Sequence, residues 1–159
     1  MDSTAKTEGR EIILSRLINA PRELVFAVWT QQRHLEKWWG PTGFTTTTHE
    51  IEISPGGKWR FIMHGPDGTD FPNRITFTEI NPPERITYIH DSDKDDDPIE
   101  FSVVVTFEDK NGMTEITQRS IFKSAEILNF LEEKYGAIEG GKQHLVRLEE
   151  YVTKQHKTN

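Results

Sequence analysis

Histidine side chains are the first place to look for chemistry in this chain, because imidazole nitrogens bind metal ions and exchange protons near neutral pH. The six are His34, His49, His64, His90, His144 and His156. Metal centres bring such ligands together at short regular spacings, for example His-x-x-x-His on one face of a helix. None of the six follows that spacing, and the chain has no cysteine. We therefore expect no metal site, no bound cofactor and no thiolate nucleophile.

Five aspartates lie close together between Asp91 and Pro98, and such a density of carboxylates suggests a calcium site. A calcium-binding loop of the EF-hand type needs glycine at its sixth position and a bidentate glutamate at its twelfth. This chain has Asp96 and Ser102 at those two positions. We interpret the stretch instead as a solvated hairpin tip whose carboxylates repel one another.

The glycines form no Gly-x-Gly-x-x-Gly or Gly-Lys-Ser/Thr phosphate-binding loop, and no Gly-x-Ser-x-Gly motif presents a nucleophilic serine. The charge gives a second exclusion, because 19 Lys and Arg residues face 26 Asp and Glu for a formal net charge of -7. An acidic chain attracts neither a nucleic-acid backbone nor an anionic membrane surface. We expect no nucleic-acid partner, no stable membrane anchor and no catalytic residue that a motif identifies.

Large aromatic side chains are the strongest chemical signal that remains. They recur on alternate residues of predicted strands or at helical spacing, so they would face one another across one interior. With two leucines of the C-terminal helix, the candidate lining residues are Trp38, Trp39, Trp59, Phe61, Phe77, Tyr88, Phe101, Leu145 and Leu148. Such a set forms either ordinary core or the wall of an apolar ligand cavity. Gly140 and Gly141 on the C-terminal helix favour the cavity.

Polar residues share the predicted inner face with these aromatic residues. Gln118 is in register with Ile116 and Phe122 on the last strand, and His90 is in register with Tyr88. A buried amide or imidazole needs a hydrogen-bond partner. Either these groups bond to neighbours and water, or they hold the polar end of a ligand.

The elements that must position these residues follow from hydrophobic periodicity and turn residues. Alternation over 12–18 predicts a strand, and helical spacing over 21–40 predicts two short helices that end at a Gly-Pro pair. Period-two patterns over 44–122, separated by turns, predict six strands with one buried face. A helix over 124–136 and a long one over 137–154 complete the order.

We expect one folded domain over 11–152, between polar tails at 1–10 and 153–159. The first ten residues lack the apolar stretch of a secretory signal, and no run reaches transmembrane length. The absence of cysteine suits a reducing compartment, so a cytoplasmic location is expected.

Four short motifs give the chain a family resemblance. They are Ala20-Pro21-Arg22-Glu23-Leu24-Val25, Trp38-Trp39-Gly40-Pro41 with Gly43-Phe44, Pro55-Gly56-Gly57-Lys58-Trp59-Arg60, and Pro82-Pro83-Glu84-Arg85-Ile86. In this order and at these intervals they resemble proteins similar to the C-terminal domain of the activator of heat-shock-protein-90 ATPase, a family of the START-like, helix-grip superfamily. The resemblance covers about residues 10–152.

The resemblance implies an α+β helix-grip fold: a curved antiparallel sheet of about seven strands around a long C-terminal helix, with two short helices after the first strand. It implies a cavity between sheet and helix, with Trp38 and Trp39 near its rim. Many relatives carry tryptophan after the glycine of the long helix, where this chain has Gly141. A missing indole there would widen the cavity or leave room for another side chain.

Three functional hypotheses follow, because members of this superfamily bind, catalyse or assist a chaperone. The first is a module that holds a small hydrophobic or amphipathic molecule in the cavity, with Gln118 and His90 as polar anchors. The second is a partner of a chaperone, whose ATPase it would stimulate through its surface. The third is a cyclase-like enzyme using His90, Tyr88 and Glu52. The sequence leaves monomer and homodimer open.

Overall fold

The computed structural model describes residues 4–158, which form strands and helices in the predicted order. The strands are β1 (Thr4–Glu8), β2 (Glu11–Ile18), β3 (Thr45–Ile51), β4 (Lys58–His64), β5 (Asp70–Asn81), β6 (Arg85–Asp91), β7 (Phe101–Lys110) and β8 (Met113–Phe122). The helices are α1 (Arg22–Thr30), α2 (Gln32–Trp38), α3 (Ala125–Tyr135) and α4 (Ala137–Thr158). The six strands expected over 44–122 are β3 to β8.

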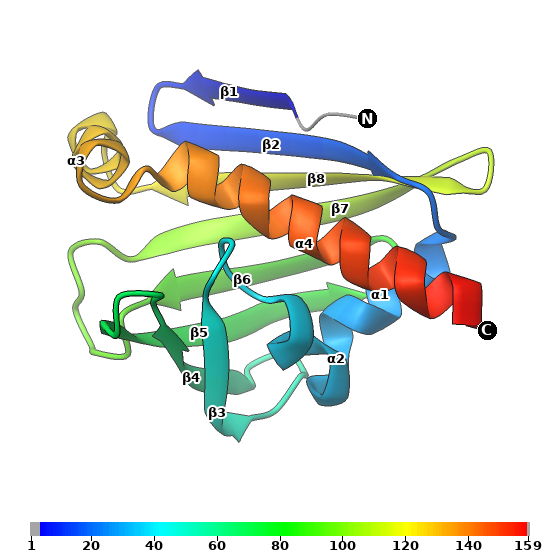
Figure 1. The fold of residues 1–159 in the computed structure, drawn as a ribbon. Coiled ribbons are helices and arrows are strands. Elements are labelled where there is room, and N and C mark those ends of the chain that lie inside the picture. Colours follow the sequence, from blue (N-terminus) through cyan, green and yellow to red (C-terminus); the bar gives the residue numbers. More distant parts are fainter. Residues whose placement is uncertain (1–3, 159) are drawn as a thin grey trace.

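The strands form one antiparallel sheet in the order β1-β2-β8-β7-β6-β5-β4-β3. Figure 1 shows this sheet curving around α4, with α1 and α2 at one end and α3 at the other. The expected α+β helix-grip fold is therefore confirmed. The sheet has one strand more than expected because Thr4–Glu8, which the sequence placed in a terminal tail, pairs with β2. The long helix likewise continues to Thr158 instead of ending near residue 154.

Strand register decides which side chains face α4. Across the middle of the sheet Tyr88 pairs with Val103, Val103 with Ser120, and Ser120 with Ile12, so these four side chains share the inner face. Side chains of successive residues alternate between faces, which places the polar neighbours Thr87 and Arg119 outside. The alternation seen in the sequence thus corresponds to one buried and one solvated face.

The helices that flank the interior have clear start and stop signals. The Ser124 side chain accepts a hydrogen bond from the Ile127 backbone N–H at 3.1 Å and caps α3. Gly136 ends α3 with φ at 62°, a left-handed conformation that glycine adopts without steric cost, and α4 begins at the next residue. The chain can therefore turn sharply from α3 into α4 and lay the long helix across the sheet.

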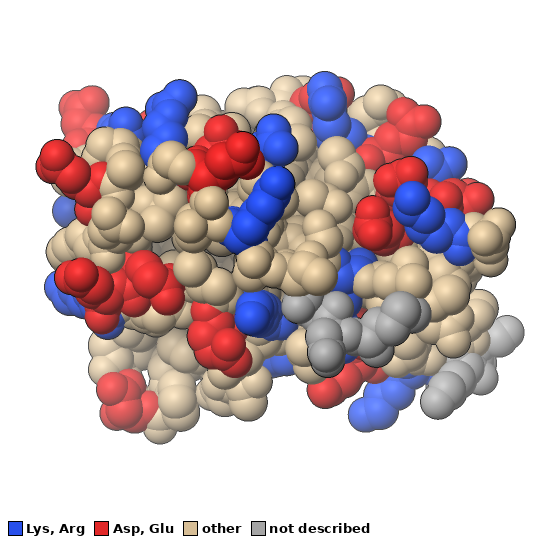
Figure 2. All heavy atoms as spheres, turned by 90° about the horizontal axis from the view of Figure 1, so that it is seen from above, with Lys and Arg blue, Asp and Glu red and all other residues tan. Residues whose placement is uncertain are grey.

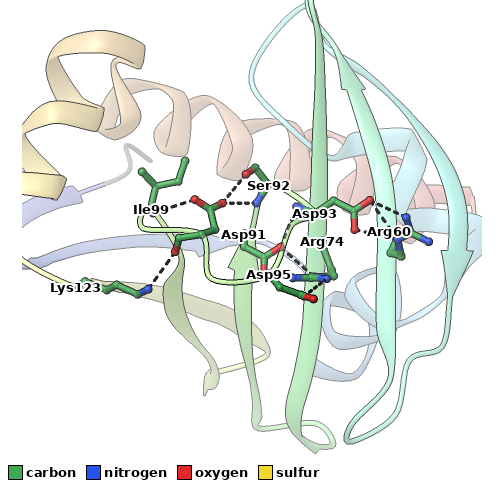
Figure 3. A network of polar contacts seen from close by, with 9 residues as sticks. Arg60, Arg74, Asp91, Ser92, Asp93, Asp95, Ile99 and Lys123 are labelled. Atoms are coloured by element: carbon green, nitrogen blue, oxygen red, sulfur yellow. Dashed lines mark hydrogen bonds and ion pairs between the residues drawn. The ribbon is translucent and has the colours of Figure 1, made fainter.

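The acid-rich loop between β6 and β7 is ordered by basic side chains of neighbouring strands (Figure 3). Arg60 of β4 donates to Asp93, and Arg74 of β5 donates to Asp91, each from Nε and Nη2. A hairpin tip of mutually repelling carboxylates was expected, and that interpretation is wrong. Sequence spacing could not reveal these partners, because the two arginines lie on other strands.

Asp97 anchors the same loop from inside. Asp97 is only 1% exposed, and its carboxylate accepts hydrogen bonds from the backbone N–H groups of Ser92 and Ile99. Burial alone would raise the pKa of Asp97, but the hydrogen bonds from Ser92 and Ile99 lower it below the ordinary value. Lys123 closes the loop against β8 by donating to the Asp97 carbonyl at 3.1 Å.

Charges of both signs are dispersed over the surface. On the face seen in Figure 2, Lys and Arg side chains alternate with Asp and Glu, and neither sign forms a broad field. Within residues 4–158, none of the helices is both long and apolar enough to cross a membrane.

Candidate functional site

The aromatic residues expected to line a cavity come together between the inner face of the sheet and α4. The fully buried members, each exposing 4% or less, are Trp38, Trp39, Trp59, Phe61, Phe77, Tyr88, Leu145 and Leu148. Trp29 of α1 lies at the centre of the group, with ring centroids 5.5 Å from Trp38, 5.1 Å from Trp39 and 5.8 Å from Tyr88. Trp29 falls within the helical spacing predicted over 21–40, but the sequence did not single it out as a lining residue. Its buried indole Nε1 has no hydrogen-bond partner.

The interior is closed at one end of the sheet and less covered at the other. At the closed end α1 packs on the sheet through Phe26 and Phe107, whose ring centroids are 5.1 Å apart. At the other end, the inner-face residues that are only half-buried are Met63, Phe71, Asn73, His90 and Phe101. Tyr135, at the end of α3, contacts Phe71 across this end with 6.4 Å between centroids. We call these half-buried residues and Tyr135 the rim.

His90 sits at the rim in a fixed neutral form. The Asn73 amide donates from Nδ2 to the Phe71 carbonyl at 2.8 Å, so its oxygen is the atom that faces His90. That oxygen accepts a hydrogen bond from His90 Nε2 at 2.7 Å. Burial lowers the pKa of His90 to about 4, although the nearby Asp91 and Asp97 act in the opposite direction. A neutral imidazole protonated on Nε2 keeps Nδ1 as an acceptor.

His144 of α4 is a second buried imidazole, which sequence reasoning considered only as a metal ligand. Its Nδ1 accepts a hydrogen bond from the Gly40 backbone N–H at 3.0 Å, so the proton of the neutral ring lies on Nε2. The ring centroid is 4.9 Å from Trp38 and 4.6 Å from Trp39. Burial lowers the pKa of His144 to about 3, and the positive charge of Arg147 acts in the same direction. The signal that could have found it is spacing, because His144 shares a helix face with Gly140, Gly141 and Leu148.

Gln118 carries the clearest unmet polar group of the inner face. The register places it between Leu14 and Val105, both of which are core residues. Its Oε1 is buried and has no hydrogen-bond partner. Leaving a buried polar group unpaired costs about 1–3 kcal/mol, so the unpaired Gln118 oxygen is a candidate for contact with a bound molecule.

Three side chains of α4 hold the loop after α2 against the site. Arg147 donates from Nη1 to the carbonyls of Trp39, Gly40 and Pro41 at 2.9, 3.0 and 2.9 Å. His144 binds the Gly40 N–H, and Gln143 accepts from the Thr42 N–H at 3.2 Å. The double-tryptophan segment is therefore positioned by the long helix, although the two lie about a hundred residues apart in sequence.

The other residues considered for acid–base chemistry are not equivalent to His90. Glu52 is exposed and accepts a hydrogen bond from Ser54 at 2.6 Å. Burial raises the pKa of Tyr88 far above its ordinary value, so its hydroxyl stays protonated. A histidine whose pKa is lowered to about 4 is a weak base near neutral pH. The arrangement is suited to hydrogen bonding with a molecule more than to moving its protons.

Comparisons with known proteins agree with this geometry. The family described as "Activator of Hsp90 ATPase homolog 1-like protein" matches residues 19–153. The chain belongs to that family. The match confirms the family resemblance that the four sequence motifs indicated. No curated protein matches the chain.

Solved structures share the fold of this family member over nearly their whole length. A protein from Arthrobacter aurescens has 25% identity and a TM-score of 0.87, covering 95% of this chain and 91% of that one. A protein from Mycobacterium smegmatis has 24% identity and a TM-score of 0.85, covering 98% and 99%. The AHSA1 protein from Silicibacter pomeroyi has 22% identity and a TM-score of 0.73, covering 92% and 99%. At these identities the likeness establishes the helix-grip fold.

Gly141 lies where α4 approaches β2 closely. A Cβ atom built at Gly141 would lie 2.4 Å from Leu14 Cδ1. Leu14 of β2 therefore fills the space beside Gly141, and a larger residue at this position would displace it. A Cβ atom at Gly140 would meet Pro41 at 3.5 Å, an ordinary contact.

Alanine at these two neighbouring glycines should have opposite effects on stability. Gly140→Ala is expected to raise the free energy of unfolding by about 1 kcal/mol through helix propensity. Gly141→Ala is expected to lower it by about 1–2 kcal/mol, because Leu14 must leave its packed position. Urea unfolding of the two variants measures both. Equal stabilisation by both alanines would show that α4 does not approach β2 as closely as described.

Proposed function

We propose that this chain binds one small apolar or amphipathic molecule between the inner face of the sheet and α4, entering at the rim. The observation that carries the proposal is the buried, unpartnered Gln118 oxygen within an aromatic and aliphatic interior. Ligand sites combine a mostly apolar wall with a few polar groups that fix orientation. Gln118 and the two neutral histidines, His90 and His144, are such groups.

The rim supports the same proposal. Aromatic side chains normally pack fully when they belong to ordinary core, yet Phe71 and Phe101 are only half-buried on the inner face. Phe101 lies 4.9 Å from His90 and 4.9 Å from Phe122, between centroids. The half-buried end gives an apolar molecule a contact surface that leads to the polar groups inside.

Native mass spectrometry of the purified protein is the first test, because it reports chain mass, oligomeric state and cargo together. We expect one small molecule per chain, which solvent extraction would then identify. If the bound molecule is lost during purification, calorimetric titration with decanol, which has an apolar chain and one hydroxyl, still detects an empty site. Absence of both cargo and decanol binding would reject the proposal.

Gln118→Leu separates a ligand group from a structural one. We expect this variant to raise the free energy of unfolding by about 1 kcal/mol, because an unpaired polar atom is removed. We also expect it to weaken decanol binding about fivefold, the effect of one lost hydrogen bond. Gln32→Leu, at an exposed position of α2, is the matched control and should leave decanol affinity unchanged. Unchanged decanol affinity in Gln118→Leu would remove Gln118 from the site.

A second candidate function comes from the family description, which names an activator of a chaperone ATPase. In that case the chain would act through its outer surface, and the interior would serve as core. An Hsp90 ATPase assay at saturating chain concentration distinguishes the two functions. Stimulation that Gln118→Leu leaves intact would favour the chaperone role.

A further inference from the structure

We infer that the molecule held in this site is uncharged and carries both a hydroxyl and a carbonyl-type oxygen. The inference rests on the proposed function and adds the ligand class. Two imidazoles carry it, since each uses one ring nitrogen within the protein and keeps the other for a different partner. Among residues 4–156, no side chain or backbone group bonds to His90 Nδ1 or to His144 Nε2.

The two free ring nitrogens have opposite hydrogen-bond roles. The Gly40 N–H occupies His144 Nδ1, which leaves Nε2–H as a donor turned away from Gly40. The Asn73 oxygen occupies His90 Nε2–H, which leaves Nδ1 as an acceptor. A chain of ring contacts joins the two imidazoles through Trp39 and Phe61. A carbonyl oxygen fits the donor, and a hydroxyl group fits the acceptor or the Gln118 oxygen.

The cationic side chains nearest the site already make ion pairs or hydrogen bonds within the protein. Arg16, on the inner face of β2, is paired with Glu149 at 2.6 Å. Arg147 donates from Nη1 to three backbone carbonyls. A ligand carboxylate would therefore lose its water without gaining a dedicated cation, which is costly in an apolar interior. The aspartates of the loop beside the rim add no attraction for an anion.

Three ten-carbon probes test the ligand class on the unmodified protein: valeroin, which has a hydroxyl and a carbonyl, butyl pentyl ketone, which has the carbonyl alone, and decanoate. We expect valeroin to bind about fivefold more tightly than the ketone, because it adds one hydrogen bond. We expect decanoate to bind at least about tenfold more weakly than valeroin, owing to the unpaired charge. Calorimetry near neutral pH measures all three.

The outcomes separate this inference from the proposed function. Decanoate binding as tightly as valeroin would overturn the uncharged class while leaving a ligand site. Failure of all three probes and of decanol would overturn both. His90→Leu assigns the hydroxyl contact: valeroin should lose its advantage over the ketone, and ketone affinity should stay within about twofold. If valeroin keeps its full advantage over the ketone in His90→Leu, His90 does not bind the hydroxyl. The ranking of the three probes is measured on the unmodified protein and does not depend on this variant.

Discussion

Replacing Arg74 by methionine should lower the free energy of unfolding by about 3 kcal/mol, because Asp91 would become a buried carboxylate without its cation. The Asp91 side chain is 5% exposed and that of Arg74 16%. Arg74 Nε and Nη2 donate to the two carboxylate oxygens at 3.0 and 2.9 Å. Methionine keeps an unbranched aliphatic stem, so the change mainly removes charge and hydrogen bonds. Urea unfolding at neutral pH measures the effect.

The same loop offers a matched control for this prediction. Arg60 binds Asp93 with the same two-nitrogen geometry, but its side chain is 45% exposed. Exposed ion pairs contribute little because water screens them. Arg60→Met should therefore change stability only slightly. Equal losses in the two variants would mean that burial does not decide the value of these pairs.

Acidification should destabilise the fold steeply, with stability lost progressively below about pH 6.5. Burial lowers the pKa of His90 to about 4 and that of His144 to about 3, so both stay neutral in the folded protein where an unfolded histidine is already charged. The unfolded chain then binds more protons, and stability falls as pH falls. In the pH range where both histidines are neutral in the folded protein and charged in the unfolded chain, the free energy of unfolding changes by about 3 kcal/mol per pH unit. Above about pH 6.5 these histidines contribute no pH dependence.

Urea unfolding at a series of pH values measures this slope. His90→Leu removes one of the two groups and should reduce the slope by about half. His49→Gln, at an exposed position of β3, is the control and should leave the slope unchanged. The lowered pKa of Asp97 adds a further loss below about pH 4, in the same direction. Coincident pH curves for the unmodified protein and His90→Leu would contradict the histidine contribution.

Local patterns were sufficient to predict the order of the elements and a sheet with one buried face, because those signals are local, whereas the helix-grip arrangement was implied by the family resemblance. Alternation along β4 and β7, helical spacing in α4 and the glycine at 136 each act over a few residues. The family follows from short motifs whose order along the chain is itself sequence information. The pairing of Thr4–Glu8 with β2 was missed because its five residues carry no apolar alternation.

The candidate site was predictable only in its apolar part. Alternation along the strands predicts that the side chains of Trp59, Phe61 and Tyr88 all lie on the inner face of the sheet. No such pattern identifies Asn73 or His144, because their roles depend on hydrogen-bond partners that are distant in the sequence. Asn73 matters through His90, seventeen residues away, and His144 through the Gly40 backbone. The acid-rich loop was misread for the same reason.

The pairing of β2 with β8 has a consequence for synthesis of the chain. Glu11 lies opposite Ile121, so β2 must wait for more than a hundred later residues before its partner emerges from the ribosome. The helix that covers the aromatic interior follows β8 in the chain and is made later still. A chain that still lacks α4 therefore exposes its tryptophans to chaperones and proteases, and protection comes only when the middle of α4, around His144 and Leu148, packs on the sheet.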